Sequence, residues 1–173
     1  MALPKTPDQL ARTLAGLLVP VSIRVWLRDL IEALLPSYAG MVRGTAFTLT
    51  AVGQTPVTIP FTGGDTAGAG ARFITNLPAG QITRIEPGAT MFGAQVTIQL
   101  PTLTDVIVEL FKNGVETVYQ TQIQTDNKAL TSTFVLTGIA IDAASATYSL
   151  RVKRVTGTSN LVVDYATFYA TLP

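Results

Sequence analysis

Carboxylates are the main groups available for acid–base chemistry in this 173-residue chain, because the sequence contains no histidine and no cysteine. These absences exclude Ser-His-Asp and Cys-His catalysis, thiolate nucleophiles, and zinc sites built from either residue. A carboxylate-dependent hydrolase remains as the enzyme alternative, and a glycosidase of that kind needs two carboxylates about 5 to 10 Å apart. No spacing indicates such a pair among the acidic residues, which include Asp65, Glu86, Asp105, Glu109, Glu116, Asp126, Asp142 and Asp164.

The same residues offer little for a bound ion. Asp126-Asn127 lacks the repeated ligands of a calcium loop. The sequence leaves open whether a divalent ion is bound between subunits. We expect no catalytic residue, no cofactor and no metal site within the chain, and we expect that the protein is not an enzyme.

A glycine-rich segment, Gly63 to Gly70, invites comparison with loops that cradle phosphate groups. Such a loop needs a helix start behind it, which directs backbone N–H groups toward the anion. Here the next residues, Ala71 to Leu77, have the pattern of a strand, and no Gly-Lys-Thr/Ser ending is present. The sequence therefore predicts a flexible loop at this segment.

The charge content is low: 13% of the residues are charged, against 47% hydrophobic residues, and the formal net charge is +1. This balance gives no long-range attraction to nucleic acid or to anionic lipid. The densest basic group, Arg151, Lys153 and Arg154, fits a solvated strand face and turn better than a nucleic-acid site. Arg72 and Arg84 lie in predicted strands, where we expect salt bridges or plain exposure. So few charges favour burial in an assembly, although secreted β-proteins share this composition.

The N-terminal region has helical periodicity. Thr6-Pro7-Asp8-Gln9 is a good helix start, and leucines follow at helical spacing until Pro20. Ser22 can cap a second helix, which Pro36 ends. Its apolar positions repeat at i, i+3, i+4 and i+7; they are Ile23, Trp26, Leu27, Leu30, Ile31, Leu34 and Leu35.

Three roles are open for this apolar face: packing on the chain's own domain, packing on another subunit or a larger partner, and lying at a membrane surface. The apolar stretch Leu14 to Ile23 covers about ten residues, whereas a membrane span needs about 20. We predict no membrane contact, and we take Ile23, Trp26, Leu27, Leu30, Ile31 and Leu34 as candidate interface residues.

The pattern changes to period two after Tyr38 to Gly44, which has the composition of a linker. Apolar and polar residues then alternate in many short segments separated by turns, and Asn113-Gly114 predicts a hairpin. This pattern predicts a β-sandwich or jelly roll over residues 44–173, preceded by a two-helix arm over residues 1–43. The predicted strands include Phe47–Ala51, Thr55–Phe61, Gln81–Glu86, Val96–Leu100, Asp105–Phe111, Val115–Gln124, Leu130–Leu136, Ala146–Val155 and Leu161–Leu172.

The final predicted strand, Leu161 to Leu172, is apolar on both faces. Strict alternation places Leu161 and Val163 on one face with Tyr165 and Tyr169. A strand of this kind is buried on both sides, with the core on one side and either further core or a subunit on the other. Because tyrosine is enriched in interface centres, Tyr165 and Tyr169 are candidate interface residues.

The C-terminal half resembles a known family. The run from Val106 to Val115, a strand that enters an Asn-Gly turn, is similar to trimeric jelly rolls of the complement C1q and tumour-necrosis-factor type. The strand Thr147 to Val152 and the final strand Leu161 to Leu172 fit the same pattern. The resemblance implies a homotrimer with its last strand near the threefold axis. Domains of this type are frequent in bacteriophage structural proteins, so it also implies a virion component.

The leading functional hypothesis is a non-enzymatic, homotrimeric capsid decoration (cement) protein in the virion. It would contact the major capsid protein or another virion protein, and no nucleic acid or membrane. Low charge, threonine-rich strands and an amphipathic arm suited to docking favour this hypothesis. The alternative is a phage tail-fibre or receptor- or glycan-binding head domain.

Overall fold

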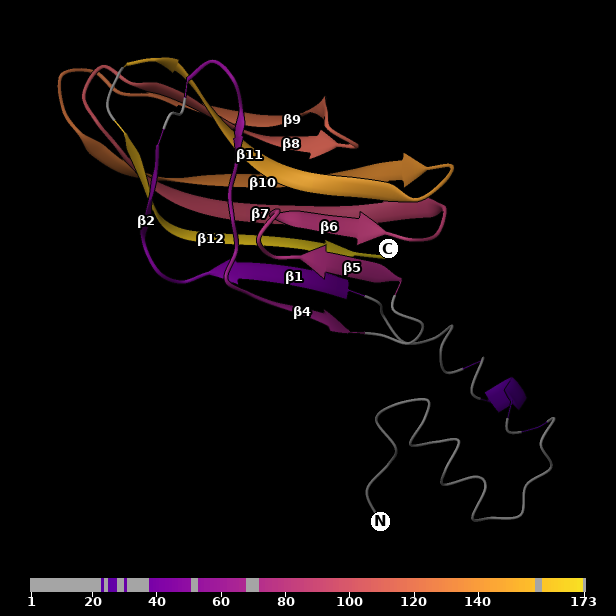
Figure 1. Ribbon diagram of the computed structural model, residues 1–173. Helices are drawn as coiled ribbons and strands as arrows, with labels where there is room; N and C mark the ends of the chain where they lie inside the picture. Colours follow the sequence, from indigo (N-terminus) through magenta and orange to yellow (C-terminus); the bar gives the residue numbers. More distant parts are fainter. Residues whose placement is uncertain are drawn as a thin grey trace.

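The computed structural model describes residues 38–50, 53–67, 72–157 and 160–172, and five positions nearer the N-terminus: Ile23, Val25, Trp26, Leu27 and Leu30. The described chain forms two stacked β-sheets (Figure 1). Sheet 1 has the strand order β10-β7-β12-β1-β4, and β2 also pairs with β12. Sheet 2 has the order β5-β6-β11-β8-β9, and β3 pairs with β11. The strands are β1 (Tyr38–Arg43), β2 (Phe47–Leu49), β3 (Val57–Thr58), β4 (Gly63–Ala67), β5 (Phe73–Asn76), β6 (Gln81–Arg84), β7 (Gly88–Leu100), β8 (Asp105–Lys112), β9 (Val115–Gln124), β10 (Leu130–Asp142), β11 (Ala146–Thr156) and β12 (Leu161–Thr171).

The order of the strands is that of a jelly roll. β1 pairs with the last strand, β12, and from β6 onward only β8 and β9 follow one another within a single sheet. Every other connection in that stretch crosses to the opposite sheet, as in the paired Greek keys of a jelly roll. The predicted fold, a mainly-β sandwich of two sheets, is confirmed.

The core lies between the sheets and follows from the alternation of side chains. Sheet 1 contributes inward residues such as Ile98 and Phe168, and sheet 2 contributes Val108, Leu110 and Leu150, all of them fully buried. The outward residues of β7 include Gln95, Thr97 and Gln99, so this strand has one apolar and one polar face. Strand β8 is different, because residues on both of its faces are buried. The predicted Asn113-Gly114 hairpin joins β8 and β9; both residues have positive φ, 51° and 80°, as a type I′ turn requires.

The predicted linker was wrong, because Tyr38–Arg43 is strand β1. It pairs with β12 on one side and with β4 on the other. Ala39 and Met41 are buried in the core, whereas Tyr38 and Val42 face outward. The sequence pattern did not indicate this strand, because Ala39 and Gly40 are small and give little contrast between its two faces. The sandwich therefore includes residues that the sequence assigned to the arm of residues 1–43.

The predicted flexible glycine loop was also wrong over Gly63–Ala67, which form strand β4 at the edge of sheet 1. Residues 68–71 lie outside the described residues. Strands β7 and β10 each have 13 residues and extend beyond the segments expected from periodicity. Threonine, glycine and alanine in these extensions weaken the apolar signal, but backbone pairing between β7 and β10 continues from Leu100–Leu130 to Gly88–Asp142.

The predicted helical arm falls mostly outside the described residues. Ile23, Val25 to Leu27 and Leu30 are helical. Residues 1–22, 24, 28–29 and 31–37 are not described, so the first predicted helix and the interface candidates Ile31 and Leu34 lie outside. Among the described residues, no helix has the length and apolar character needed to span a membrane.

The predicted faces of the last strand were wrong because β12 contains a β-bulge. Its pairing with β7 shifts register between Val163 and Tyr165, with Asp164 as the extra residue. Leu161 and Val163 before the bulge are buried, and so are Ala166, Phe168 and Ala170 after it. One inserted residue thus turns Tyr165 and Tyr169 to the face opposite Leu161 and Val163.

A candidate subunit interface on sheet 1

The outer face of sheet 1, which points away from the core, carries a broad set of exposed apolar side chains. Strand register puts Tyr169 between Gly93 on β7 and Gly40 on β1, and it puts Tyr165 beside Thr97. Tyr165 and Tyr169 are 38% and 48% exposed. The exposed large hydrophobic residues of this face are Tyr38, Val42, Met91, Val135, Ile139, Ile141, Tyr165 and Tyr169.

This face has little charge. Between the apolar residues lie Gln95, Thr97, Thr137 and Thr167. On this outer face, the charged residue with a described side chain is Asp164 at the bulge, and Gln99 Nε2 donates to its Oδ1 at 2.8 Å. Strand register also places Asp65 of β4 beside Gly40. Such a face combines exposed tyrosine with an uncharged centre, which is the composition found at interface centres.

A shallow apolar hollow lies on this face near the β1–β4 edge. It has a volume of about 430 Å³ and is lined by Gly40, Met41, Val42, Gly64, Thr167, Phe168 and Tyr169. Gly40 leaves its floor open, because a Cβ atom added there would meet no atom within 4 Å. The ring of Tyr169 lies instead over Gly93, where a Cβ would collide with it. The hollow thus exists because Tyr169 leans toward β7 and Gly40 has no side chain.

A cluster of buried polar residues lies at one end of the sandwich and includes Arg84. The sequence predicted a salt bridge or plain exposure for Arg84, and this prediction was wrong. The Arg84 guanidinium is buried and donates to Thr90 Oγ1 and the Pro87 carbonyl, both at 2.9 Å, and to the Ala89 carbonyl. Nearby, the Tyr148 hydroxyl donates to Asp142, which also pairs with Lys112. Burial and the adjacent carboxylate raise the pKa of Tyr148 well above its ordinary value. These contacts pair most of the buried polar atoms of the cluster, although Arg84 Nε and Asp142 Oδ1 make no hydrogen bond of normal geometry to the described residues. We therefore assign the cluster a structural role.

Glu109 lies on the outer face of β8 in sheet 2. Among the described acidic residues, it is the one with no exposed surface. Lys153 Nζ lies 3.6 Å from Glu109 Oε2 and 3.8 Å from Glu116 Oε1. Neither Glu109 oxygen makes a hydrogen bond of normal geometry to the described residues. Burial, and then the neighbouring Glu116, raise the pKa of Glu109, which Lys153 offsets only in part. The predicted salt bridge of Arg72 is present, with Nε 3.5 Å from Glu86 Oε2.

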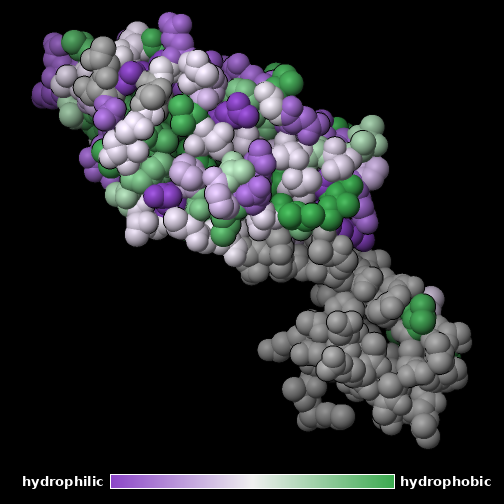
Figure 2. All heavy atoms as spheres, viewed as in Figure 1, coloured by the Kyte–Doolittle hydropathy of each residue, from purple (hydrophilic) through white to green (hydrophobic). Residues whose placement is uncertain are grey.

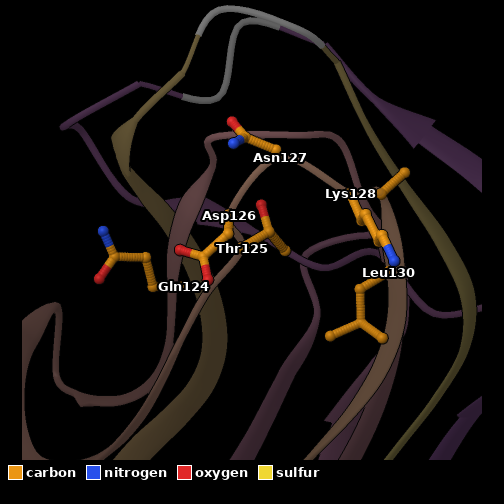
Figure 3. A pocket seen from close by; sticks show the side chains of 7 residues that line it. Gln124, Thr125, Asp126, Asn127, Lys128 and Leu130 are labelled. Carbon is orange, nitrogen blue, oxygen red and sulfur yellow. The ribbon is translucent and has the colours of Figure 1, made fainter.

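A second hollow lies beside the β9–β10 connection and has a volume of about 510 Å³ (Figure 3). Its lining runs from Gln124 to Leu130 and contains one carboxylate, Asp126, and one ammonium group, Lys128. Thr125 anchors this loop, because its hydroxyl donates to the Pro101 carbonyl at 2.6 Å and accepts from the Thr104 N–H at 3.0 Å. With a single carboxylate and no aromatic lining residue, the hollow provides neither a glycosidase pair nor a stacking surface for sugars. Within the described part of the chain, no three acidic side chains gather in a way that could hold a metal ion.

The candidate interface residues are accessible where the structure describes them. Ile23, Trp26 and Leu30 are exposed, with Trp26 61% exposed, and Leu27 is partly buried. Tyr165 and Tyr169 share the outer face of sheet 1. Their role in an interface stays a prediction. Sequence reasoning missed the other members of this face, although Val135, Ile139 and Ile141 do alternate with polar or small residues along β10.

The surface agrees with the low charge of the sequence. Figure 2 shows many residues of intermediate hydropathy on the visible face of the sandwich, with hydrophobic residues dispersed among them. Along strands β9 and β10, exposed positions include several threonines and glutamines, at a surface where soluble domains usually carry more charged residues.

Comparisons with known proteins give a likeness of fold. No protein-family model matches the chain, and no curated protein matches it. Among solved structures, the chain is similar to the globular domain of zebrafish complement 1qA protein, with 13% identity and a TM-score of 0.47. The similarity covers 78% of this chain and 94% of the zebrafish chain. At this level no property of the zebrafish domain transfers to this protein.

Proposed function

We propose that this protein is a non-enzymatic assembly module whose copies associate through the outer face of sheet 1 into a homotrimer. The observation that carries the proposal is the exposed, aromatic and nearly uncharged face around Tyr165 and Tyr169. Monomeric soluble proteins rarely leave a large apolar area of this kind open to water. A copy of the same chain is a suitable partner, because a face with so few charges repels a second copy little.

The finer part of the proposal is a virion role, in which the trimer is a capsid decoration (cement) protein. The sandwich would supply the trimer, and the N-terminal region would dock on the major capsid protein or another virion protein. Exposed Ile23, Trp26 and Leu30 support such docking, since aromatic and aliphatic anchors contribute most of the energy of many interfaces. A tail-fibre or glycan-binding head is the alternative, and the hollow at Gln124–Leu130 offers it no aromatic platform.

The oligomeric state tests the assembly proposal. We expect the full chain to be a trimer by native mass spectrometry and Tyr169→Arg to be mainly monomeric, because an arginine would be buried without a partner. Ile74→Arg is the matched control, since Ile74 is 54% exposed on β5 of the other sheet. A monomeric wild-type chain, or equal effects of the two substitutions, would contradict the proposal.

Binding to particles tests the virion role separately. Purified trimer should bind capsids that lack it, and Trp26→Ser should reduce that binding while the trimer persists. Lack of binding to such capsids, together with hits on a glycan array, would favour the receptor-binding alternative.

A further inference from the structure

One ammonium group on the outer face of sheet 2 serves two carboxylates that come from different strands. Lys153 Nζ on β11 lies 3.6 Å from Glu109 Oε2 on β8 and 3.8 Å from Glu116 Oε1 on β9. In the sheet, β8 lies between β11 and β9 (Figure 1). The pair of Lys153 and Glu116 therefore fastens β9 to β11 across the strand between them, and Glu109 competes with Glu116 for the same ammonium.

Glu109 has little else that would neutralise a charge on it. Its side chain has no exposed surface, and neither carboxylate oxygen makes a hydrogen bond of normal geometry to the described residues. Arg151 lies in register with Glu109, but its guanidinium stacks 4.0 Å from the centre of the Phe111 ring, and its Nε lies 3.4 Å from Ser149 Oγ. Ionisation of Glu109 is therefore costly unless Lys153 moves to it.

The other charged side chains of β8, β9 and β11 are engaged elsewhere. On β8, Asp105 accepts from Gln122 Nε2, and Lys112 pairs with Asp142. On β11, Arg154 lies in register with a core residue of β8. Among the described residues of these three strands, the carboxylate of β9 and the ammonium of β11 are thus the charged groups that face the buried carboxyl group.

Strand β9 is irregular beside Glu116. Its pairing with β8 passes from Glu109–Gln120 to Phe111–Glu116, which leaves extra residues on β9. Thr117 spans this bulge, because its hydroxyl donates to the Leu110 carbonyl at 2.7 Å and accepts from the Tyr119 N–H at 3.2 Å. A bulge leaves residues without partners in the ladder, so fewer backbone bonds oppose its opening.

The bulge has a fixed point on each side. Before it, Asn113 Oδ1 accepts from the Thr147 N–H at 2.8 Å. After it, the Tyr119 hydroxyl donates to the Ile139 carbonyl on β10. An opening between these points is confined to Val115–Val118, the segment that carries Glu116, and local openings of this size require less energy than unfolding of the domain.

We propose that Glu109, Glu116 and Lys153 form a pH-dependent latch, which holds the bulge of β9 closed in acid and releases it as the pH rises. While Glu109 is protonated, Lys153 pairs with Glu116 and the bulge stays against β8. When Glu109 ionises, it draws Lys153 toward itself and repels Glu116.

The direction of the pH effect follows from the environment of Glu109. Burial, and then the neighbouring Glu116, raise its pKa above the ordinary glutamate value. The closed form therefore has its full advantage below the ordinary pKa, and this advantage is lost as the pH rises through the raised pKa. The latch lies on sheet 2 and does not depend on the proposed assembly through sheet 1.

Hydrogen exchange resolved by NMR tests the latch. Protection factors, which correct for the pH dependence of intrinsic exchange, are measured for the amides from Glu116 to Tyr119 and for those of β7. We expect protection in the bulge to fall by about tenfold between about pH 5 and pH 8, because one pKa unit corresponds to a factor of ten. The bulge amides should be insensitive to low urea, since a local opening exposes little surface, whereas β7 amides should be sensitive.

Three variants identify the titrating group. Glu109→Gln should keep the bulge protected at both pH values, and Glu116→Gln, which changes a half-exposed side chain, should remove most of the pH effect. Glu86→Gln is the matched control and should behave like wild type, because Glu86 is exposed and pairs with Arg72.

The possible results divide clearly. Protection of the bulge that does not change with pH in wild type would overturn the latch. An equal change in wild type and Glu109→Gln would also overturn it, since another group would then titrate. If the bulge amides were as sensitive to urea as those of β7, the bulge would open only with the whole domain, and the proposal would fail.

Discussion

Glu109 shows how one residue of this sandwich can work against stability. Its carboxylate is fully buried beside Glu116, and its pKa is raised above the ordinary glutamate value. The folded state therefore holds a proton more tightly than the unfolded chain does. Stability is lost as the pH rises above the unfolded pKa toward the folded pKa, and it is regained as the pH falls.

We predict that Glu109→Gln stabilises the protein near neutral pH and removes this loss, because glutamine has no proton to give up. The two proteins should become similar in stability at acidic pH. Urea unfolding from about pH 4 to 8 measures the effect. Glu86→Gln, which removes an exposed carboxylate, is the control. A variant that is less stable than wild type at neutral pH would show that the pairing with Lys153 outweighs burial.

Tyr148 supports the buried cluster at the end of the sandwich. Its hydroxyl donates to Asp142, and burial together with this carboxylate raises its pKa above the ordinary tyrosine value. We predict that Tyr148→Phe costs about 1 to 3 kcal/mol, because Asp142 is buried and loses a partner. Tyr119→Phe, which removes a more exposed hydrogen bond to the Ile139 carbonyl, should cost less in the same denaturation experiment. Equal losses would mean that burial of Asp142 does not matter.

Strands β9 and β10 close one edge of the sandwich through aromatic packing. The Phe92 and Tyr119 rings meet edge to face with centroids 4.8 Å apart, and both lie against Gly138 of β10. A Cβ added at Gly138 would come within 2.5 Å of each ring. A glycine is needed here because the rings occupy the space of its side chain.

We predict that Gly138→Ala destabilises the protein by about 1 to 3 kcal/mol, since the rings must shift from their packed positions. Gly44→Ala is the matched control, because its added Cβ would meet nothing within 4 Å. Thermal unfolding monitored by near-ultraviolet circular dichroism reports both stability and ring packing. The packing argument fails if the two variants unfold alike.

At the scale of single elements, the sequence predicted correctly those elements whose conformation depends on their own residue types. The Asn113-Gly114 hairpin was predicted because a type I′ turn demands those residue types. The strand at Tyr38–Arg43 was missed, because Ala39 and Gly40 have little strand propensity and two neighbouring strands stabilise them. The bulge at Asp164 was missed for a similar reason, since only pairing with β7 reveals an extra residue.

The whole molecule divides its proposed roles between the sandwich and the region before Tyr38. We predict that a chain lacking residues 1–37 keeps the trimer, because the outer face of sheet 1 and strand β1 remain intact. The same chain should lose binding to capsids. Native mass spectrometry and a particle-binding assay measure the two effects. Loss of the trimer on truncation would instead assign assembly to the N-terminal region.

The sequence by itself determined the class of fold. Period-two alternation, turn residues and the near absence of helical patterns after residue 44 specify many short strands, and such strands bury their apolar faces by packing as two sheets. The absence of histidine and cysteine likewise narrowed the possible chemistry without any structure. The apolar pattern of the last predicted strand also identified Tyr165 and Tyr169 as candidate interface residues.

Only the tertiary structure decided which residues share a surface. Met91, Ile139 and Tyr169 are far apart in the sequence, and strand register places them on one face. The bulge in β12 sets which way the two tyrosines point, and the glycine at position 40 opens a hollow beside one of them. These features depend on pairing between distant strands, and a local pattern carries no information about that pairing.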